Sequence, residues 1–183
     1  MQRIMVVGQP GSGKSTLARM LGARTGLPVV HMDQIHWQPG WIERSRDDKD
    51  RLCAEVEALP AWIFEGGHSR TYDSRAARAD LLIWLDVPIW RRLWRVSKRT
   101  LLGRGRTRPD LPENCPEMLR KLPEFYRFIW RSRHVSRDRI VRLLAEVRPD
   151  LPVVFLRNLA ELRAYVATLP DLATLPGHDK SRG

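Results

Sequence analysis

The fold is decided by the stretch Gly8-Gln9-Pro10-Gly11-Ser12-Gly13-Lys14-Ser15, which matches the complete pattern G-x-x-x-x-G-K-S of a phosphate-binding loop. The apolar run at 4–7 before it predicts a short buried strand, and apolar residues at helical spacing over 15–21 predict a helix after it. Strand, glycine loop and helix is the order that such a loop requires. The alternative, a chance glycine-rich turn, does not account for this context.

Each part of the loop has a role in holding a nucleoside triphosphate. The glycines let backbone N–H groups point at phosphate oxygens, and the helix N-terminus adds its positive dipole. Lys14 supplies a mobile charge for the β and γ phosphates, and the Ser15 hydroxyl is a ligand for Mg²⁺. The sequence thus predicts ATP and Mg²⁺ as cofactors. The predicted nucleotide-binding residues of the loop are Gly8, Pro10, Gly11, Ser12, Gly13, Lys14, Ser15 and Thr16.

The length of 183 residues fits one domain with an insertion. We expect a domain over 1–169, with a lid at about 100–116, and a flexible tail over 170–183. No run reaches about 18 apolar residues, and Cys53 and Cys115 are isolated from other metal-ligating residues. These features predict a soluble, cytoplasmic protein, a monomer or a homodimer, with no membrane partner.

The positive charge is concentrated in one segment. Residues 89–148 hold 17 Lys or Arg and 6 Asp or Glu, so their net charge of +11 equals that of the whole chain. Nearly all of these cations are arginines, which bind phosphate and carboxylate groups in planar, bidentate fashion. The segment therefore indicates a polyanionic ligand, with a solvated basic face as the alternative. Charge alone also predicts weak, nonspecific binding of nucleic acid.

Apolar runs at 4–7, 27–31, 61–65, 81–85 and 151–156 alternate with helical patterns, which predicts a three-layer α/β protein with a parallel sheet. Asp33 follows the second strand, where a carboxylate can orient or deprotonate an acceptor hydroxyl, or simply cap a helix. The loop 34–46 after it carries Trp37 and Trp41, which either bind substrate or cover the core.

No N-K-x-D motif for reading a guanine base is present, which argues against a GTPase switch, and the chain is too short for a ring-forming ATPase. A small phosphotransferase remains. Phosphoryl transfer depends on positioning and on positive charge around the transferred group. The glycine-hinged basic loop 103–109 predicts a lid that supplies part of this charge through Arg104, Arg106 and Arg108.

The element Leu85-Asp86-Val87-Pro88 resembles the Asp-Val-Pro element of nucleoside-monophosphate-kinase-like proteins, of which adenylate kinase is the best known. In those kinases, arginines nine and thirteen residues past the Asp enter the active site, which implies catalytic roles for Arg95 and Arg99. The resemblance implies a P-loop NTPase kinase fold with the strand order 2-3-1-4-5 and a basic helical lid. It also places Asn158, after the fifth strand, beside the adenine ring.

Over most of the first 165 residues the chain is similar to bacterial DNA topology modulation proteins, a group that also looks like a kinase by fold. The similarity rests on five further stretches: His31-Met32-Asp33, Trp37-x-Pro39-Gly40-Trp41, Ile63-x-Glu65-Gly66-x-x-Ser69, Ala79-Asp80 and Arg104-Gly105-Arg106-Thr107-Arg108-Pro109. Such kinases usually carry Asp-Gly after the third strand, and the Asp holds Mg²⁺ through water. Here Glu65-Gly66 replaces it, so Glu65 is the expected metal carboxylate beside Ser15.

The adenylate kinase motif Asp-Gly-x-Pro-Arg for the acceptor nucleotide is absent, because Gly67-His68-Ser69-Arg70 stands in its place. We therefore expect a nucleotide or small hydroxyl-bearing acceptor that is not bound as AMP is. Asp33, Trp37, Trp41 and Arg75 are its predicted contacts, and Lys14, Asp33, Arg95 and Arg99 the predicted catalytic residues. The alternative is a nucleic-acid-associated ATPase or regulator of DNA topology that uses the basic segment 89–148.

Overall fold

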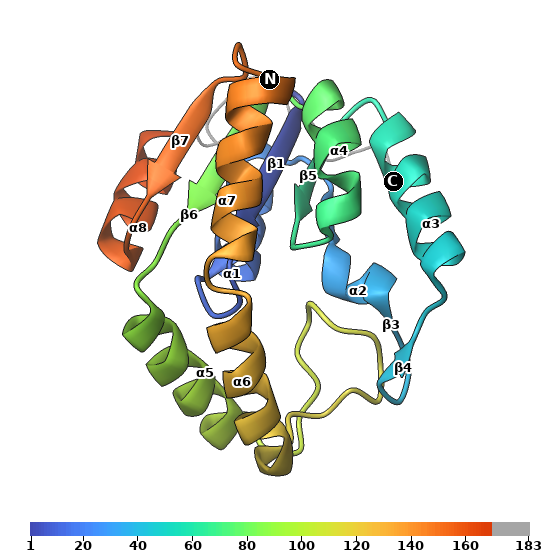
Figure 1. Cartoon of the computed structure of the whole chain (residues 1–183), viewed down its shortest axis with the longest axis vertical. Helices are drawn as coiled ribbons and strands as arrows, with labels where there is room; N and C mark the ends of the chain where they lie inside the picture. The colour runs from blue at the N-terminus through green and yellow to red at the C-terminus, as the bar shows by residue number, and fades with distance from the viewer. Residues whose placement is uncertain (170–183) are drawn as a thin grey trace, which may run out of the picture.

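A computed structural model describes residues 1–169 of the chain, and the predicted flexible tail 170–183 lies outside the described residues. The centre of the molecule is a parallel five-stranded sheet (Figure 1). Counted among the sheet strands alone, the spatial order is 2-3-1-4-5, so the predicted fold class is confirmed. The strands in spatial order are β2 (Val29–His31), β5 (Trp62–Glu65), β1 (Arg3–Gly8), β6 (Leu81–Leu85) and β7 (Val153–Leu156).

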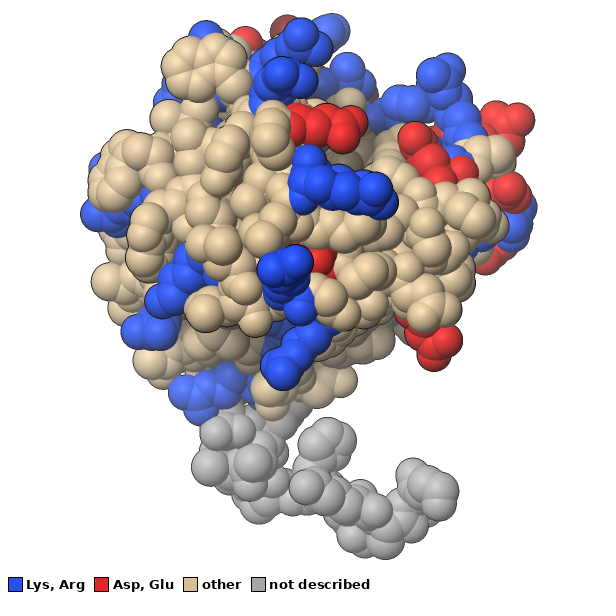
Figure 2. Space-filling view, turned by 90° about the horizontal axis from the view of Figure 1, so that it is seen from below, with Lys and Arg blue, Asp and Glu red and all other residues tan. Residues whose placement is uncertain are grey.

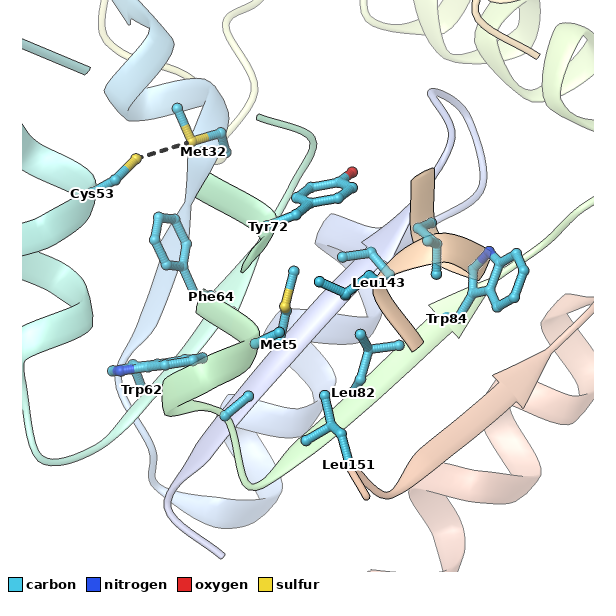
Figure 3. Packing of buried hydrophobic residues seen from close by; sticks show 14 of the residues in the cluster. Met5, Met32, Cys53, Trp62, Phe64, Tyr72, Leu82, Trp84, Leu143 and Leu151 are labelled. Carbon is cyan, nitrogen blue, oxygen red and sulfur yellow. Dashed lines mark hydrogen bonds between the residues drawn. The ribbon is translucent and has the colours of Figure 1, made fainter. Parts of the chain in front are cut away.

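The central strands β5, β1 and β6 are buried on both faces, which explains why they are apolar without alternation, whereas Val153 and Phe155 of the edge strand β7 are exposed. Ile4 and Val6 of β1 lie in one apolar cluster, and Met5 and Val7 lie in the other, on the opposite face (Figure 3). Five helices supply most of the cover: α1 (Lys14–Thr25) and α8 (Leu159–Thr168) on the first face, and α3 (Arg46–Ala58), α4 (Tyr72–Arg78) and α7 (Val135–Arg142) on the second.

The basic insertion extends past the carboxyl ends of the strands and forms the lower part of Figure 1. It consists of α5 (Ile89–Leu102), the loop 103–118 and α6 (Leu122–Arg131), and α5 contacts α6. A 3₁₀ turn over Leu119–Lys121 precedes α6, and Pro123 occupies the first turn of α6, where a proline needs no hydrogen-bond partner.

Four short elements, two helices and two strands, were missed by periodicity. The expected loop 34–46 contains the end of α2 (Met32–His36) and a hairpin of β3 (Trp37–Gln38) and β4 (Ile42–Glu43). Helix α4 was also not foreseen. Each is too short to show a repeat in sequence. The hairpin turns at Gly40, whose φ is +82°, a conformation that favours glycine.

Charge is unevenly distributed on the surface. Figure 2 looks at the end formed by α5, α6 and the loop 103–118, where Lys and Arg are spread widely and the acidic side chains gather toward α3 and the β3–β4 hairpin. Among residues 1–169, no helix is both long enough and apolar enough to cross a bilayer.

Candidate functional site

The phosphate-binding loop joins β1 to α1 and is tightly enclosed. Its glycines have φ values of +149° at Gly8, +79° at Gly11 and +103° at Gly13. A Cβ on Gly8 would stand 2.5 Å from the Leu85 carbonyl oxygen, so glycine is needed there for space as well as conformation. Helix α1 begins directly after Gly13 without a side-chain cap. Its first N–H groups are therefore available to an anion held by the loop.

Three charged side chains from three elements lie close enough beside the loop to influence one another electrostatically. They are Lys14 of α1, Asp33 of α2 and Glu65 at the end of β5, and each interacts electrostatically with the other two. Lys14 Nζ donates a hydrogen bond to the Gln9 carbonyl oxygen at 3.2 Å, so its side chain curls back over the loop. Burial lowers the pKa of Lys14, and the two carboxylates offset part of that effect.

Asp33 lies at the start of α2, directly after β2 and across from the loop. Surrounding protein atoms raise the pKa of Asp33, and the Glu65 carboxylate raises it further, while Arg108 and Lys14 act in the opposite direction. The side chain is still 48% exposed. A carboxyl with a raised pKa that remains accessible has the properties of a general base.

Helix α5 directs two arginines toward this region because they are four residues apart on one helical face. Arg95 Nη1 donates to the Ser12 carbonyl oxygen at 2.8 Å, and a Cβ on Gly13 would come within 3.1 Å of Arg95 Nη2. Arg99 instead forms an ion pair with Glu117, with Nε and Oε1 3.0 Å apart. The structure thus places Arg95 on the loop itself and Arg99 on the loop 103–118.

Arg108 links the loop 103–118 to Asp33. Its guanidinium forms ion pairs with Asp33 at 3.8 Å and Glu117 at 2.9 Å, and with Asp110. Glu117 and Asp110 are both buried, and Glu117 also accepts a hydrogen bond from Thr100. Arg104 and Arg106, by contrast, are exposed. Of the three lid arginines, Arg108 is the one that the structure brings to Asp33.

One of the two hairpin tryptophans, Trp41, contacts the same loop. Trp41 Nε1 donates to the Pro116 carbonyl oxygen at 3.1 Å, and Lys121 Nζ lies 4.7 Å from the ring centroid. Trp37 packs edge-on against Trp41, with ring centroids 5.3 Å apart. Trp41 therefore joins the hairpin to the loop 103–118. The hairpin directly follows α2, the helix that carries Asp33.

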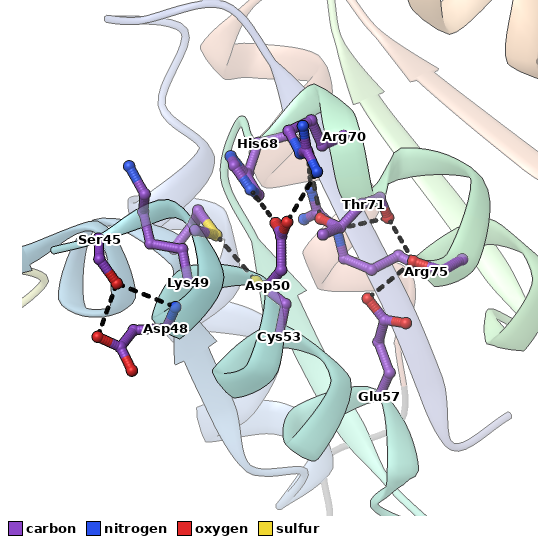
Figure 4. Close-up of polar contacts among 12 residues, drawn as sticks. Ser45, Asp48, Lys49, Asp50, Cys53, Glu57, His68, Arg70, Thr71 and Arg75 are labelled. Atoms are coloured by element: carbon purple, nitrogen blue, oxygen red, sulfur yellow. Dashed lines mark hydrogen bonds and ion pairs between the residues drawn. The ribbon is translucent and has the colours of Figure 1, made fainter.

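Arg75 and Asn158 take part in local structure. Arg75 is fully buried, donates to the carbonyl oxygens of Gly66, His68 and Thr71, and lies over the Phe64 and Tyr72 rings (Figure 4 shows this region). No exposed part of it faces an acceptor in this arrangement. Instead it supports the turn after β5. Asn158 caps α8 by accepting from the Glu161 N–H at 2.9 Å.

Sequence reasoning missed the buried partners of the candidate residues. His31 Nδ1 lies 2.7 Å from Glu65 Oε1, and Glu117 and Asp110 hold Arg108. The carboxylates of the loop 103–118 carried no signal in a segment dominated by arginine. For His31 a signal existed, because a histidine ends an otherwise apolar strand two residues before Asp33.

No protein-family model matches the chain. Among curated proteins, mouse "Threonine synthase-like 1" is 24% identical over 103 residues, which cover 48% of this chain and 14% of that protein. The chain therefore spans about a seventh of this relative, whose activity as a whole says nothing direct about it.

Solved structures resemble the fold over nearly the whole chain. Deoxyadenosine kinase from M. mycoides aligns with a TM-score of 0.56 and 14% identity, covering 90% of this chain and 95% of that one. Shikimate kinase from Bacteroides thetaiotaomicron aligns with a TM-score of 0.50 and 15% identity, covering 91% and 94%. The chain thus has the fold of P-loop kinases that act on small molecules, and at these identities the likeness concerns the fold alone.

Proposed function

We propose that the chain is a Mg²⁺-dependent phosphotransferase that moves the γ-phosphoryl group of ATP to a nucleotide or small hydroxyl-bearing acceptor. The observation that carries the proposal is the placement of Asp33 and Glu65, at the carboxyl ends of β2 and β5, beside a complete phosphate-binding loop that leads into Lys14. A hydrolase or switch needs the loop and a metal carboxylate. An accessible carboxyl with a raised pKa across from the loop adds what a hydroxyl acceptor requires.

The residues present fit a Mg²⁺ ion bound together with ATP. Ser15 lies in the first turn of α1, and Glu65 ends the strand beside β1, paired in register with Val6. Among residues 1–169 no group of three or more His, Cys, Asp or Glu is arranged to hold a metal ion. Mg²⁺ with ATP does not need one, because it keeps several waters and takes phosphate oxygens as ligands. When bound, the ion neutralises charge on the β and γ phosphates.

In the proposed reaction, Asp33 accepts a hydrogen bond from the acceptor hydroxyl and takes its proton as the acceptor oxygen bonds to the γ phosphorus. The bond from that phosphorus to the β–γ bridging oxygen breaks, and ADP leaves with the electron pair. Lys14 and Arg95 hold the transferring group in line. Their attraction to its oxygens grows as negative charge develops there. Arg108 would leave Asp33 and contact the phosphates instead. Arg99, which is paired with Glu117 of the same loop, would approach the phosphates together with Arg108. Trp37 and Trp41 would form the wall of the acceptor side.

We further propose that residues 1–169 fold as one domain.

We expect the loop 103–109 to become more protected when nucleotide binds. Arg108 gains phosphate partners while Glu117 still holds its other side, so local opening becomes rarer. Amide hydrogen exchange measured with and without an ATP analogue and Mg²⁺ should show slower exchange over 103–109. Exchange over residues 52–58 of α3, on the face of the sheet opposite α1, should not change. Unchanged exchange over 103–109, with binding confirmed separately, would remove this loop from the nucleotide site.

A nucleic-acid-associated ATPase or regulator, as in the DNA topology modulation proteins, is the second candidate. One observation favours it: Trp90 and Trp94 are 63% and 61% exposed on α5. Arg91 and Lys98 lie over their rings at 4.9 and 5.1 Å. Exposed aromatic rings beside cations are typical of surfaces that stack bases and follow a phosphate backbone.

We expect DNA binding by this surface to be weak and electrostatic. Labelled duplex DNA should bind with a dissociation constant of about 10⁻⁴ to 10⁻⁶ M at physiological salt, and log affinity should fall by about 0.9 per neutralised phosphate against log salt. Fluorescence anisotropy across a salt series measures both. Much tighter binding that ATP leaves unchanged and that Trp90→Ala and Trp94→Ala abolish would support the second candidate over the kinase.

The proposed function is tested by incubating the protein with ATP, Mg²⁺ and a panel of nucleosides, nucleotides, sugars and small hydroxy acids, and measuring ADP release. We expect one chemical class to stimulate release well above the rate without acceptor. Equal release with every compound and with none would indicate a hydrolase instead.

A further inference from the structure

The side chains of His31 and Glu65 form a buried polar pair that the proposed reaction leaves partly unused. The two residues are directly opposite each other in the register of β2 and β5. They are 6% and 2% exposed, and His31 Nδ1 lies 2.7 Å from Glu65 Oε1. A carboxylate oxygen accepts, so in the pair with a carboxylate His31 donates from Nδ1.

This pair is difficult to explain by stability alone. Its strand neighbours on the same face, Val29 and Ile63, belong to the apolar cluster covered by α1 and α8. An apolar residue in place of His31 would continue that cluster without the desolvation of a buried ring and carboxylate. Buried polar pairs are in general weak contributors to stability compared with apolar residues of similar volume. The bond therefore points to a need for a fixed orientation of the Glu65 carboxylate.

The position of Glu65 shows what that orientation serves. It ends the strand next to β1 and interacts with Lys14 and Asp33. With Oε1 held by His31, rotation of the carboxylate is restricted and the second oxygen keeps one direction. A carboxylate that reaches Mg²⁺ through water depends on such a fixed direction, because the water must meet both the carboxylate and the ion.

We propose that His31 is a positioning residue that orients Glu65 toward the Mg²⁺ ion bound with ATP. This inference rests on the proposed function, in which Glu65 and Ser15 serve that ion. His31 itself contacts neither ATP nor the ion. It acts through one hydrogen bond, so a residue that preserves the donor should preserve the effect.

The test compares His31→Leu, which removes the donor, with His31→Asn, whose amide places an N–H near the Nδ1 position. Binding of Mn²⁺ to the complex with a non-hydrolysable ATP analogue is measured by electron paramagnetic resonance, which does not depend on turnover. Loss of such outer contacts typically weakens metal affinity by about 10- to 100-fold. We expect a loss of this size in His31→Leu and a value within a few-fold of wild type in His31→Asn.

A matched control is His68→Leu, because His68 Nε2 pairs with Asp50 Oδ1 at 3.0 Å on the α3 side (Figure 4). It should leave Mn²⁺ affinity unchanged. Both substitutions are also made in the Glu65→Gln background. There, His31→Asn and His31→Leu should cause no further loss of Mn²⁺ affinity beyond that of Glu65→Gln alone, because His31 acts through Glu65.

The outcomes separate this inference from the proposed function. Wild-type affinity in a folded His31→Leu, or an equal loss in His31→Asn, overturns the role of His31 while Glu65→Gln still weakens Mn²⁺ binding. If His31→Leu does not fold, the comparison of His31→Asn with His31→Gln decides, because the longer amide cannot keep the same geometry and should bind Mn²⁺ more weakly. Absence of any Mn²⁺–analogue binding by the wild-type protein overturns both.

Discussion

Replacing Lys14 with alanine is expected to reduce turnover by about 10³- to 10⁵-fold and to leave the fold intact. Groups that stabilise charge on a transferring phosphoryl group contribute about this much to the rate. Lys14 belongs to neither apolar cluster, and its Nζ bonds to the Gln9 carbonyl oxygen of the loop itself. Burial lowers the pKa of Lys14, which means that the charged side chain does not stabilise the fold. Alanine at this position should therefore cost little stability.

Steady-state ADP release and far-UV circular dichroism of Lys14→Ala measure the two parts of this expectation. Lys98→Ala is the matched control, because Lys98 is an exposed lysine of α5 that lies over the Trp94 ring. It should turn over at a rate close to wild type. A native spectrum with near-normal turnover in Lys14→Ala would contradict the role given to this lysine.

Replacing Asp33 with asparagine is expected to lower acceptor-dependent transfer by about 10²- to 10⁴-fold, the usual contribution of a general base. The affinity for an ATP analogue should barely change, because the donor is held by the loop after β1. The measurement is kcat/KM for the acceptor together with a binding constant for the analogue. Asp47→Asn, which alters an exposed carboxylate in the first turn of α3, is the control.

The same variant has an expected effect on stability. The pKa of Asp33 is raised in the folded protein, so the protonated form is favoured there. Its stabilising contribution is present at acidic pH and is lost as pH rises through the raised pKa. At pH 7 the neutral asparagine should therefore unfold at the same or a higher temperature than wild type. A lower Tm together with lost ATP binding would instead give Asp33 a framework role.

The sequence was sufficient for the sheet and for the loop. Strands buried on both faces leave long apolar runs, and the motif at 8–15 places the first strand and α1 without ambiguity. Of the two arginines expected at fixed offsets, Arg95 contacts the Ser12 carbonyl oxygen and Arg99 pairs with Glu117, and their catalytic roles stay predictions. All of these patterns are local, because each spans about fifteen consecutive residues or fewer.

Contacts made across the chain could not be predicted in this way. Arg108 meets Asp33 across 75 positions, and Trp41 meets Pro116 across a similar span, and no local pattern encodes either contact. Arg75 illustrates the opposite problem. An arginine after the third strand suggests an anion contact, yet burial among carbonyl oxygens and two aromatic rings satisfies it locally. Such choices depend on packing rather than on residue type.

The fate of the γ-phosphoryl group tests the central claim most directly. ATP labelled at the γ position is incubated with the protein, Mg²⁺ and the acceptor that most stimulates ADP release, and the products are separated and identified by mass spectrometry. We expect one labelled, phosphorylated acceptor per ADP, and loss of that product in Asp33→Asn. Label recovered as inorganic phosphate, at the same rate with or without acceptor and in Asp33→Asn, would contradict the assignment of a phosphotransferase.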